Sequence, residues 1–180
     1  MALELNGTTG VSLVQDGVVT AADLASGAIT SAALPAGSVL QVVNGNTSSM
    51  VTSSTTQTWV DTGITATITP TSTSSKIIVW VNLMGLWRNT NNSWNRTAIR
   101  ILRGSTVLGI EAFAQSWPNT SLEFRNGGLA YSHYDSPETT VATTYKVQFQ
   151  AEFLSDNTGI SVQKDNNSGT SQIFLMEIAE

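Results

Sequence analysis

A segment of strict alternation, Tyr145–Phe153, constrains the fold of this chain more than any other feature. Its odd-numbered residues are all apolar: Tyr145, Val147, Phe149, Ala151 and Phe153. The residues between them are polar or charged: Lys146, Gln148, Gln150 and Glu152. Successive side chains of a β-strand point to opposite faces of its sheet, so this period of two predicts a strand with its apolar face on a core. The polar face is expected to meet water or another chain.

From Val39 onward the chain repeats this pattern in shorter segments. Lys76–Trp87 is the second strong strand; it is apolar on both faces and is therefore expected at the centre of a sheet or at an interface. Further strands are expected at Val39–Val43, Thr56–Asp61, Ile64–Thr69, Thr97–Arg103, Thr106–Phe113, Gly128–Tyr134, Gly159–Lys164 and Gln172–Ala179. Turns between them are expected at sites that include Asn44-Gly45, Asp61-Thr62-Gly63, Arg103-Gly104-Ser105 and Asn126-Gly127-Gly128. Many short strands predict an all-β fold, a jelly-roll-like antiparallel β-sandwich knob.

Two decapeptides that precede the expected sandwich have nearly the same sequence. Asp16–Leu24 is matched by Ser26–Leu34, with glycine aligned with glycine and the apolar positions in register. A unit this short has too few apolar side chains to enclose a core, so such repeats become stable only against neighbours or against copies from other chains. We predict a short extended arm over residues 1–36, used for anchoring and trimerisation, and the β-sandwich knob over 37–180. The predicted trimer seam consists of Val19, Leu24, Ile29 and Leu34.

The composition of the chain favours a component of an assembly. Charged residues make up 12% of the sequence, about half of the usual ~25%, and Ser, Thr, Asn and Gly take their place. A neutral surface suits packing among identical copies, whereas many like charges would repel. A small open sandwich with few charges also exposes strand edges, and closed rotational symmetry is one way to cover them. We therefore expect a homotrimer.

Several classes of partner and compartment are disfavoured by the sequence. A net charge of −5 argues against nucleic acid, which requires clustered Lys and Arg. The absence of cysteine excludes disulfides and thiolate metal sites. No apolar stretch approaches the ~18 residues of a membrane span, so no membrane insertion is expected. Met1–Gly10 lacks the basic region and apolar run of a signal peptide, which predicts assembly in a cytoplasm.

Segments along nearly the whole chain resemble virion structural proteins of tailed phages, notably cyanophages. They are Gly37–Val43, Trp59–Ile64, Ile68–Ile77, Asp135–Pro137, Thr144–Gln148 and Ser171–Ala179. The Asp-Gly-x-Val/Ile-Thr-x-Ala repeats are similar to short segments that precede knobs in fibre proteins. The resemblance rests on structural motifs and includes no catalytic signature. It implies a trimeric β-sandwich knob displayed on a virion, either as a cement protein on the capsid or as the tip of a fibre or tailspike.

The length of the arm favours the first of these locations. About 35 residues span at most about 120 Å when fully extended, and two decapeptides make a stub where a host-reaching fibre needs a shaft. We therefore expect a capsid cement (decoration) protein bound to the major capsid protein through Leu3, Leu5, Val11 and Leu13. In the alternative reading of this segment it is a frayed terminus. In the alternative function, the chain is a short tail fibre or tailspike tip held by a tail attachment protein.

No catalytic site is predicted. His133, the single histidine, is expected in a strand in which its neighbours Ser132 and Tyr134 point to the opposite face. The Gly-x-Ser-x-Gly elbow of a serine nucleophile is missing. Paired carboxylates for glycoside cleavage must face each other across a cleft, and nothing in the sequence brings together Glu111 with Glu123, or Asp135 with Glu138. We predict that the chain is not an enzyme and uses no cofactor.

Two loops contain the oxygen ligands that Ca²⁺ favours. They are Asp156-Asn157 and Asp165-Asn166-Asn167, and neither has the alternating acids and closing glutamate of a calcium loop. Asp and Asn in hairpins are more often turn formers. No metal site is predicted.

Three tryptophans, Trp87, Trp94 and Trp117, lie in or beside loops rich in Asn, Ser and Thr. Flat aromatic faces flanked by amides suit sugar rings, so these residues are candidates for binding a host-surface glycan. In the structural alternative, Trp87 ends a core strand and Trp117 plugs a sheet end or the trimer axis. Trp59 and Trp80, inside predicted strands, are expected in the core.

Overall fold

The computed structural model of the protein describes residues 5–6, 10–11, 29–30, 33–88, 95–116, 124–152, 159–163 and 169–180. The chain divides into two compact units, Met1–Pro35 and Ala36–Glu180. In the first unit, β1 (Leu5–Asn6) and β2 (Gly10–Val11) pair antiparallel, with Leu5 opposite Val11. The sequence prediction places the division of the chain after residue 36.

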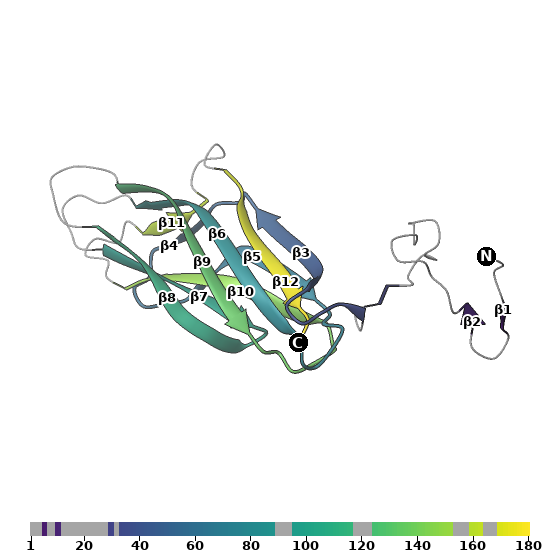
Figure 1. The fold of residues 1–180 in the computed structure, drawn as a ribbon. Coiled ribbons are helices and arrows are strands. Elements are labelled where there is room, and N and C mark those ends of the chain that lie inside the picture. Colours follow the sequence, from purple (N-terminus) through teal and green to yellow (C-terminus); the bar gives the residue numbers. More distant parts are fainter. Residues whose placement is uncertain are drawn as a thin grey trace. The chain divides into compact units, whose positions relative to one another are not determined.

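The second unit consists of two antiparallel sheets (Figure 1). Its strands are β3 (Val39–Thr47), β4 (Val51–Ser53), β5 (Val60–Ile68), β6 (Lys76–Arg88), β7 (Asn95–Arg103), β8 (Thr106–Ser116), β9 (Phe124–Asp135), β10 (Thr143–Ala151), β11 (Ile160–Val162) and β12 (Ser171–Ile178). The smaller sheet has the order β5-β10-β7-β8, and the larger one the order β3-β12-β6-β11-β4 with β9 paired to β6. No helix is among the elements of the described residues. The predicted all-β fold with a β-sandwich is confirmed; the jelly roll stays a prediction.

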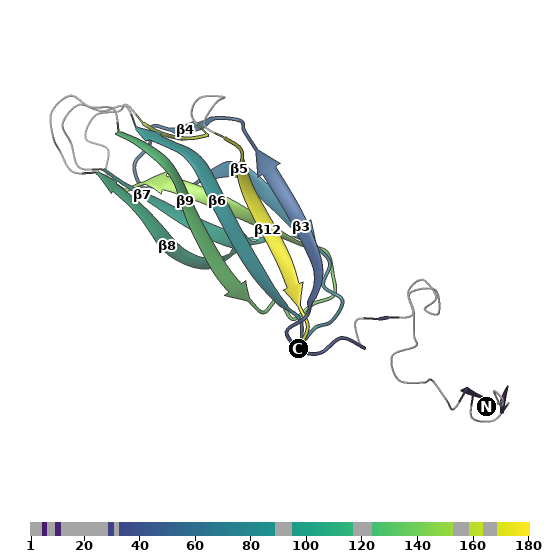
Figure 2. The ribbon, with the colours of Figure 1, turned by 45° about the horizontal axis from the view of Figure 1, so that its top comes forward.

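The larger sheet is four strands wide at most points along β6. Along one edge of β6, β12 pairs with Lys76–Asn82 and β11 with Trp87 and Arg88. Along the other edge β9 pairs over nearly the whole length of β6. On the far side of these two strands, β3 pairs with β12 and β4 pairs with β11. Figure 2 shows β3, β12, β6 and β9 side by side in one layer. The predicted central position of Lys76–Trp87 is therefore confirmed.

The core lies between the two sheets and is built from alternate residues of their strands. β10 buries Tyr145, Val147, Phe149 and Ala151, all 0% exposed, while the residues between them point outward. β6 contributes Ile77, Val79, Val81 and Leu83 from the other sheet, also at 0–1% exposure. Each such side chain contributes about 1.5–3 kcal/mol relative to an exposed one. The predicted alternation is thus confirmed for Tyr145–Ala151, while Phe153 lies outside the described residues.

Three of the predicted turns lie inside strands. Asn44-Gly45 is part of β3, Asp61–Gly63 of β5, and Asn126–Gly128 of β9. The prediction of separate strands at Thr56–Asp61 and Ile64–Thr69 is wrong, because the single strand β5 runs from Val60 to Ile68 and so joins the end of the first segment to the second. The turn at Arg103-Gly104-Ser105 is confirmed, with Gly104 at φ +57. The sequence analysis also missed the short strand β4.

The Asp61–Gly63 segment forms a β-bulge in β5. The pairing with β10 shifts register between Lys146 and Gln148, and Gly63 takes φ +83, a conformation that glycine adopts without steric cost. Thr62 holds the bulge: its Oγ1 donates to the Val147 carbonyl at 2.9 Å and accepts from the Ile64 amide at 3.1 Å. The residues that suggested a turn therefore bend a continuous strand.

Candidate functional site

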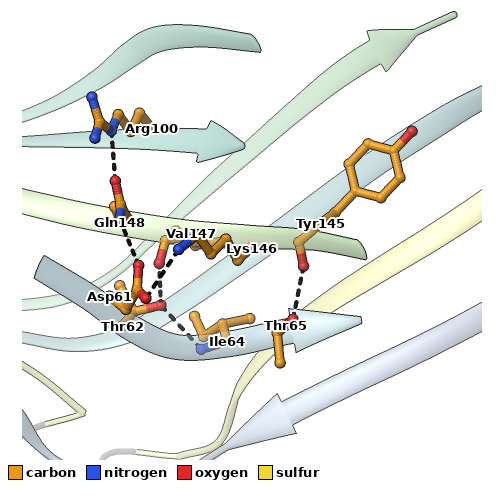
Figure 3. A network of polar contacts seen from close by, with 9 residues as sticks. All are labelled: Asp61, Thr62, Ile64, Thr65, Arg100, Tyr145, Lys146, Val147 and Gln148. Atoms are coloured by element: carbon orange, nitrogen blue, oxygen red, sulfur yellow. Dashed lines mark hydrogen bonds and ion pairs between the residues drawn. The ribbon is translucent and has the colours of Figure 1, made fainter. Parts of the chain in front are cut away.

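The outer face of the smaller sheet carries a polar network that crosses three strands (Figure 3). Arg100 Nε of β7 donates to Gln148 Oε1 of β10 at 2.8 Å, and Gln148 Nε2 donates to Asp61 Oδ1 of β5 at 2.6 Å. Lys146 Nζ reaches Asp61 Oδ2 at 3.1 Å. Partial burial acts to raise the pKa of Asp61, but the donors on Gln148 and Lys146 outweigh it and lower this pKa. Lys146 thus pairs directly with Asp61, and Gln148 connects Arg100 to the same carboxylate.

Neither Trp59 nor Trp80 lies in the core, so the prediction for both is wrong. Trp59 is half-buried at the start of β5, and the guanidinium carbon of Arg100 lies 4.1 Å from the centroid of its ring, a cation–π contact. Trp80 is 52% exposed. It alternates along β6 with Val79 and Val81, which fill the core, and therefore points to the outer face.

The outer face of the larger sheet is apolar over its end nearest the C-terminus. In one registered row Met176 of β12 lies between Val42 of β3 and Ile78 of β6, and Ile78 lies opposite Tyr134 of β9. In the next row Phe174 lies opposite Trp80, and the uncharged polar residues Asn44 of β3 and Ser132 of β9 flank this pair. We call these six residues the apolar face: Val42, Ile78, Trp80, Tyr134, Phe174 and Met176.

Three members of the apolar face are more than half exposed: Val42 at 55%, Trp80 at 52% and Tyr134 at 56%. The following row is polar, with Asn46, Gln172 and Asn82 in register. At the opposite margin Lys76 pairs with Glu180 at 3.2 Å. The described side chains of the two apolar rows include no charged group. Large exposed apolar patches with polar rims are typical of protein contact sites, which makes this face the principal candidate for a functional surface.

On the inner side of the same sheet, two buried carboxylates flank Ile77. Glu177 of β12 and Asp135 of β9 both lie opposite Ile77 in register, and they are 0% and 7% exposed. The sequence contained a usable indication of them, because both fall at positions that a period of two assigns to the core face. An acid at such a position implies partners, since buried charges are paired or hydrogen-bonded.

Asp135 joins the two sheets through partners on β7 and β10. Arg103 Nη1 donates to both of its oxygens, at 2.9 and 2.8 Å, and to the Ser136 carbonyl at 3.0 Å. The Tyr145 hydroxyl donates to Asp135 Oδ2 at 2.7 Å. Burial, together with this carboxylate, raises the pKa of Tyr145 far above its ordinary value. The hydroxyl therefore remains a donor at any pH at which the protein is studied.

Glu177 ties β12 to β3 and to the segment between β5 and β6. Gln41 Nε2 donates to Glu177 Oε2 at 2.6 Å and to the Thr69 carbonyl at 2.7 Å. The Thr71 amide and Oγ1 donate to Glu177 Oε1 at 2.6 and 2.7 Å. Burial acts to raise the pKa of Glu177, but these donors favour the charged form and lower the pKa below its ordinary value of 4.5.

Glu177→Gln is expected to destabilise the sandwich more at neutral pH than in acid. Because the folded pKa is depressed, the carboxylate adds stability above about pH 4.5, and this stability is lost as the pH falls through the lower folded pKa. We expect a loss of about 1.5–3 kcal/mol at pH 7 and a much smaller one near pH 3, measured by urea unfolding. Glu180→Gln, which removes an exposed partner of Lys76, serves as control and should cost less than about 1 kcal/mol. An equal loss for Glu177→Gln at both pH values would contradict this assignment.

The two buried acids are about 10 Å apart, since two strand spacings separate them, a distance near that of inverting glycosidase pairs. Their oxygens, however, face the interior and accept from Arg103, Tyr145, Gln41 and Thr71. They act as structural links. Of the other acid pairs considered, the side chains of Glu111 and Glu123 lie outside the described part. The absence of enzyme activity stays a prediction.

The residues predicted to bind partners are described only in part. Leu3, Leu13, Val19, Leu24, Trp94 and Trp117 lie outside the described residues, as do both loops considered for Ca²⁺. Leu5 and Val11 are paired strand residues, whose side chains are not described. Ile29 and Leu34 are 57% and 38% exposed. Trp87 is half-buried near the end of β6, opposite Arg125 and Ser161.

Among the described residues, no three His, Cys, Asp or Glu side chains are grouped so as to hold a metal ion. That same part of the chain contains no helix of the length and apolarity needed to span a membrane. Neither the protein-family models nor the curated proteins compared with this chain include a match. The fold and the surfaces are therefore the structural observations from which a function can be argued.

Proposed function

We propose that this protein is a phage virion structural protein, a trimeric capsid cement (decoration) protein that reinforces the outer surface of the head. The observation that carries the proposal is the division of the chain into Met1–Pro35 and the much larger sandwich unit Ala36–Glu180. A short arm followed by a knob suits a protein that sits on a shell and clamps it.

The order of the strands supports the jelly roll that the resemblance implies. The chain changes sheet between β4 and β5, β5 and β6, β6 and β7, β8 and β9, β9 and β10, and β10 and β11. Only β7 and β8 follow each other as a hairpin within the smaller sheet. With β3 and β4 counted as one strand and β11 and β12 as another, the two sheets have four strands each. Double-sheet jelly rolls of eight strands occur in viral capsid proteins and in lectins, so this fold suits either the head or the tail.

A strand at the margin of the larger sheet supports the proposed homotrimer. Among the described strands, the nine-residue β3 pairs on one side only, with β12, and its sequence has neither a charged residue nor a proline. Proteins usually protect such edges with charges, prolines or a covering element. Packing of copies about a closed symmetry axis provides a cover, and the major capsid protein is the proposed partner of the arm.

Deletion of Met1–Asp16 is expected to abolish binding to phage heads while leaving the sandwich folded. The clamp proposal assigns shell contact to Leu3, Leu5, Val11 and Leu13, and the deletion removes all four. Binding is measured by co-sedimentation of the purified chain with undecorated heads, and folding by circular dichroism and melting temperature. A deleted chain that still decorates heads at the level of the full chain would exclude the clamp.

The second candidate function is a receptor-binding tip on a short tail fibre or tailspike, in which Trp87, Trp94 and Trp117 contact a host-surface glycan. The fold favours it as much as it favours a head protein, because jelly rolls also serve as lectins. Electron microscopy of virions that carry a label on this chain separates the two functions. A cement protein is expected at near-stoichiometric occupancy over the head, and a tip at low copy number on the tail.

A further inference from the structure

The apolar face is an extended surface on the open side of a sheet. Four neighbouring strands about 4.8 Å apart, followed over the about four residues of ~3.4 Å rise that two rows span, present roughly 260 Å² before side-chain relief is counted. Sites for small molecules are concave and enclose most of the ligand. An area of this size is about a third of the ~800 Å² that each partner contributes to a stable protein interface. The dimensions of the apolar face therefore fit a protein partner.

The charge on the two outer faces indicates which protein that partner is. The outer face of the smaller sheet bears Asp61, Lys146 and Arg100, joined in one network. The two rows of the apolar face bear no described charged side chain, although the chain as a whole has a net charge of −5. Copies of an acidic protein repel each other over charged parts of their surfaces, and a neutral region lets neighbouring copies approach without like charges opposed.

The position of the apolar face also suits contact between copies. The Gly37 amide donates to the Ala179 carbonyl at 2.8 Å, and the Ala179 amide donates to the Ser38 carbonyl at 2.9 Å. The chain thus enters the sandwich beside Ile178, at the end of the larger sheet that carries the apolar rows. Copies joined through their arms are brought together at this end.

We infer that the apolar face is the surface through which copies of this chain pack against one another around the symmetry axis. This inference rests on the proposed trimer and adds to it the surface by which the knobs associate. Trp80 and Phe174, opposite each other in register, are its aromatic anchors, because a few large side chains that become buried carry most of the energy of an interface. Asn46, Gln172 and Asn82 form the polar rim on one side. The smaller sheet then faces outward from the axis.

Trp80→Glu in the full chain tests this assignment, with Thr67→Glu as the matched control. Both positions are exposed strand residues on the outer faces of opposite sheets, and both variants gain one negative charge. By light scattering coupled to gel filtration, we expect the parent chain and Thr67→Glu to have the mass of a trimer. Trp80→Glu is expected to weaken association at least a hundredfold and to run as a monomer at micromolar concentration. Unchanged circular dichroism confirms that the variant is folded.

A second measurement does not depend on dissociation. The chain has no cysteine, so Ser132→Cys, opposite Trp80 on β9, and Thr67→Cys each place one unique thiol on an exposed site. We expect a bulky maleimide to label Ser132→Cys at least ten times more slowly than Thr67→Cys in the native assembly, and both equally in urea. Equal native rates would overturn the inference.

The outcomes separate this inference from the proposed function. If the parent chain and Trp80→Glu are both trimers and the two thiols are labelled at equal rates, the apolar face is not the contact between copies. The cement function is then unaffected. An assembly that depends on Trp80 but does not bind heads confirms the face and refutes the cement function. If the parent chain is a dimer and Trp80→Glu is a monomer, the apolar face is confirmed as the contact and the proposed trimer is contradicted. A parent chain that is monomeric overturns both the face and the trimer.

Discussion

Replacing Asp135 with alanine is expected to lower the free energy of unfolding by about 3 kcal/mol, near the lower end of the cost of breaking a buried ion pair. Asp135 is 7% exposed and accepts from both Arg103 and Tyr145. Its removal takes the charged partner from the Arg103 guanidinium, which retains the Ser136 carbonyl, and takes the carboxylate acceptor from the buried Tyr145 hydroxyl. The links that the Asp135 carboxylate makes from β9 to the smaller sheet are lost. The Arg103 side chain is 27% exposed, so water replaces part of what it loses. Urea unfolding at pH 7 measures the effect.

Two further variants show whether the burial of Asp135 is the reason for the large loss of stability. Tyr145→Phe keeps the ring and removes one hydrogen bond to a charged group, for an expected loss of about 1.5 kcal/mol. Asp61→Ala also removes a carboxylate that pairs with a cation, but its side chain is 55% exposed, and exposed pairs contribute less than about 1 kcal/mol. The expected order of losses is Asp135→Ala, Tyr145→Phe, Asp61→Ala. If Asp135→Ala costs no more than Asp61→Ala, the buried network adds nothing to stability.

Periodicity predicted β5 and β10 well because each of these strands has a single buried face. Tyr145–Ala151 keeps strict alternation, and the buried residues are the ones that a period of two assigns to the core. Lys76–Trp87 is apolar on both faces, from which a central strand or an interface was expected. The strand proved central, yet its outer residue Trp80 is exposed and Ile78 is only partly buried. One face of β6 serves the core, and the other forms part of the apolar face.

Residues typical of turns led to wrong predictions because the same residues also occur inside strands for other structural reasons. Asn-Gly and Asp-x-Gly favour turns, but they also suit bulges and close approaches of two backbones. Gly63 uses its positive φ in a bulge of β5. Gly45 has no room for a side chain because β5 of the other sheet approaches it. Both reasons depend on strands distant in sequence, which no local pattern reveals.

To predict the candidate surface, one needs the register between strands as well as the pattern of residues within each strand. Each of Val42, Trp80, Tyr134 and Phe174 is an ordinary strand residue on its own. They become one surface because β3, β12, β6 and β9 align them in neighbouring rows. The same holds for Asp135 and Glu177, which are far apart in sequence and both lie opposite Ile77. Single-strand periodicity assigns a face to each residue, but only the pairing shows which residues share a row.

Gly45→Ala is expected to be the most damaging small substitution in the sandwich. A Cβ at this position would lie within bonding distance of the Thr65 carbonyl oxygen, 2.8 Å from the carbonyl carbon of the same residue and 3.2 Å from the Ala66 Cβ. The obstacle is backbone of β5 and cannot rotate away, so β3 and β5 must separate. We expect a loss above about 3 kcal/mol, beyond the usual range for overpacking. Urea unfolding, or loss of soluble expression, measures it.

Gly104→Ala is the control for Gly45→Ala. It replaces a glycine at a position where the added methyl group has space, so it does not include the steric clash. Gly104 lies in the turn between β7 and β8 at φ +57, and no other atom lies within 4 Å of its added Cβ. The change should cost about 1–2 kcal/mol, the steric price of a left-handed conformation for a residue with a side chain. Gly45 has no such φ, so the cost of its substitution comes from contact with Thr65 and Ala66 of β5. Equal losses for the two variants would mean that β3 and β5 do not approach as closely as this packing requires, and the edge of the apolar face at Val42 would then lose its fixed position.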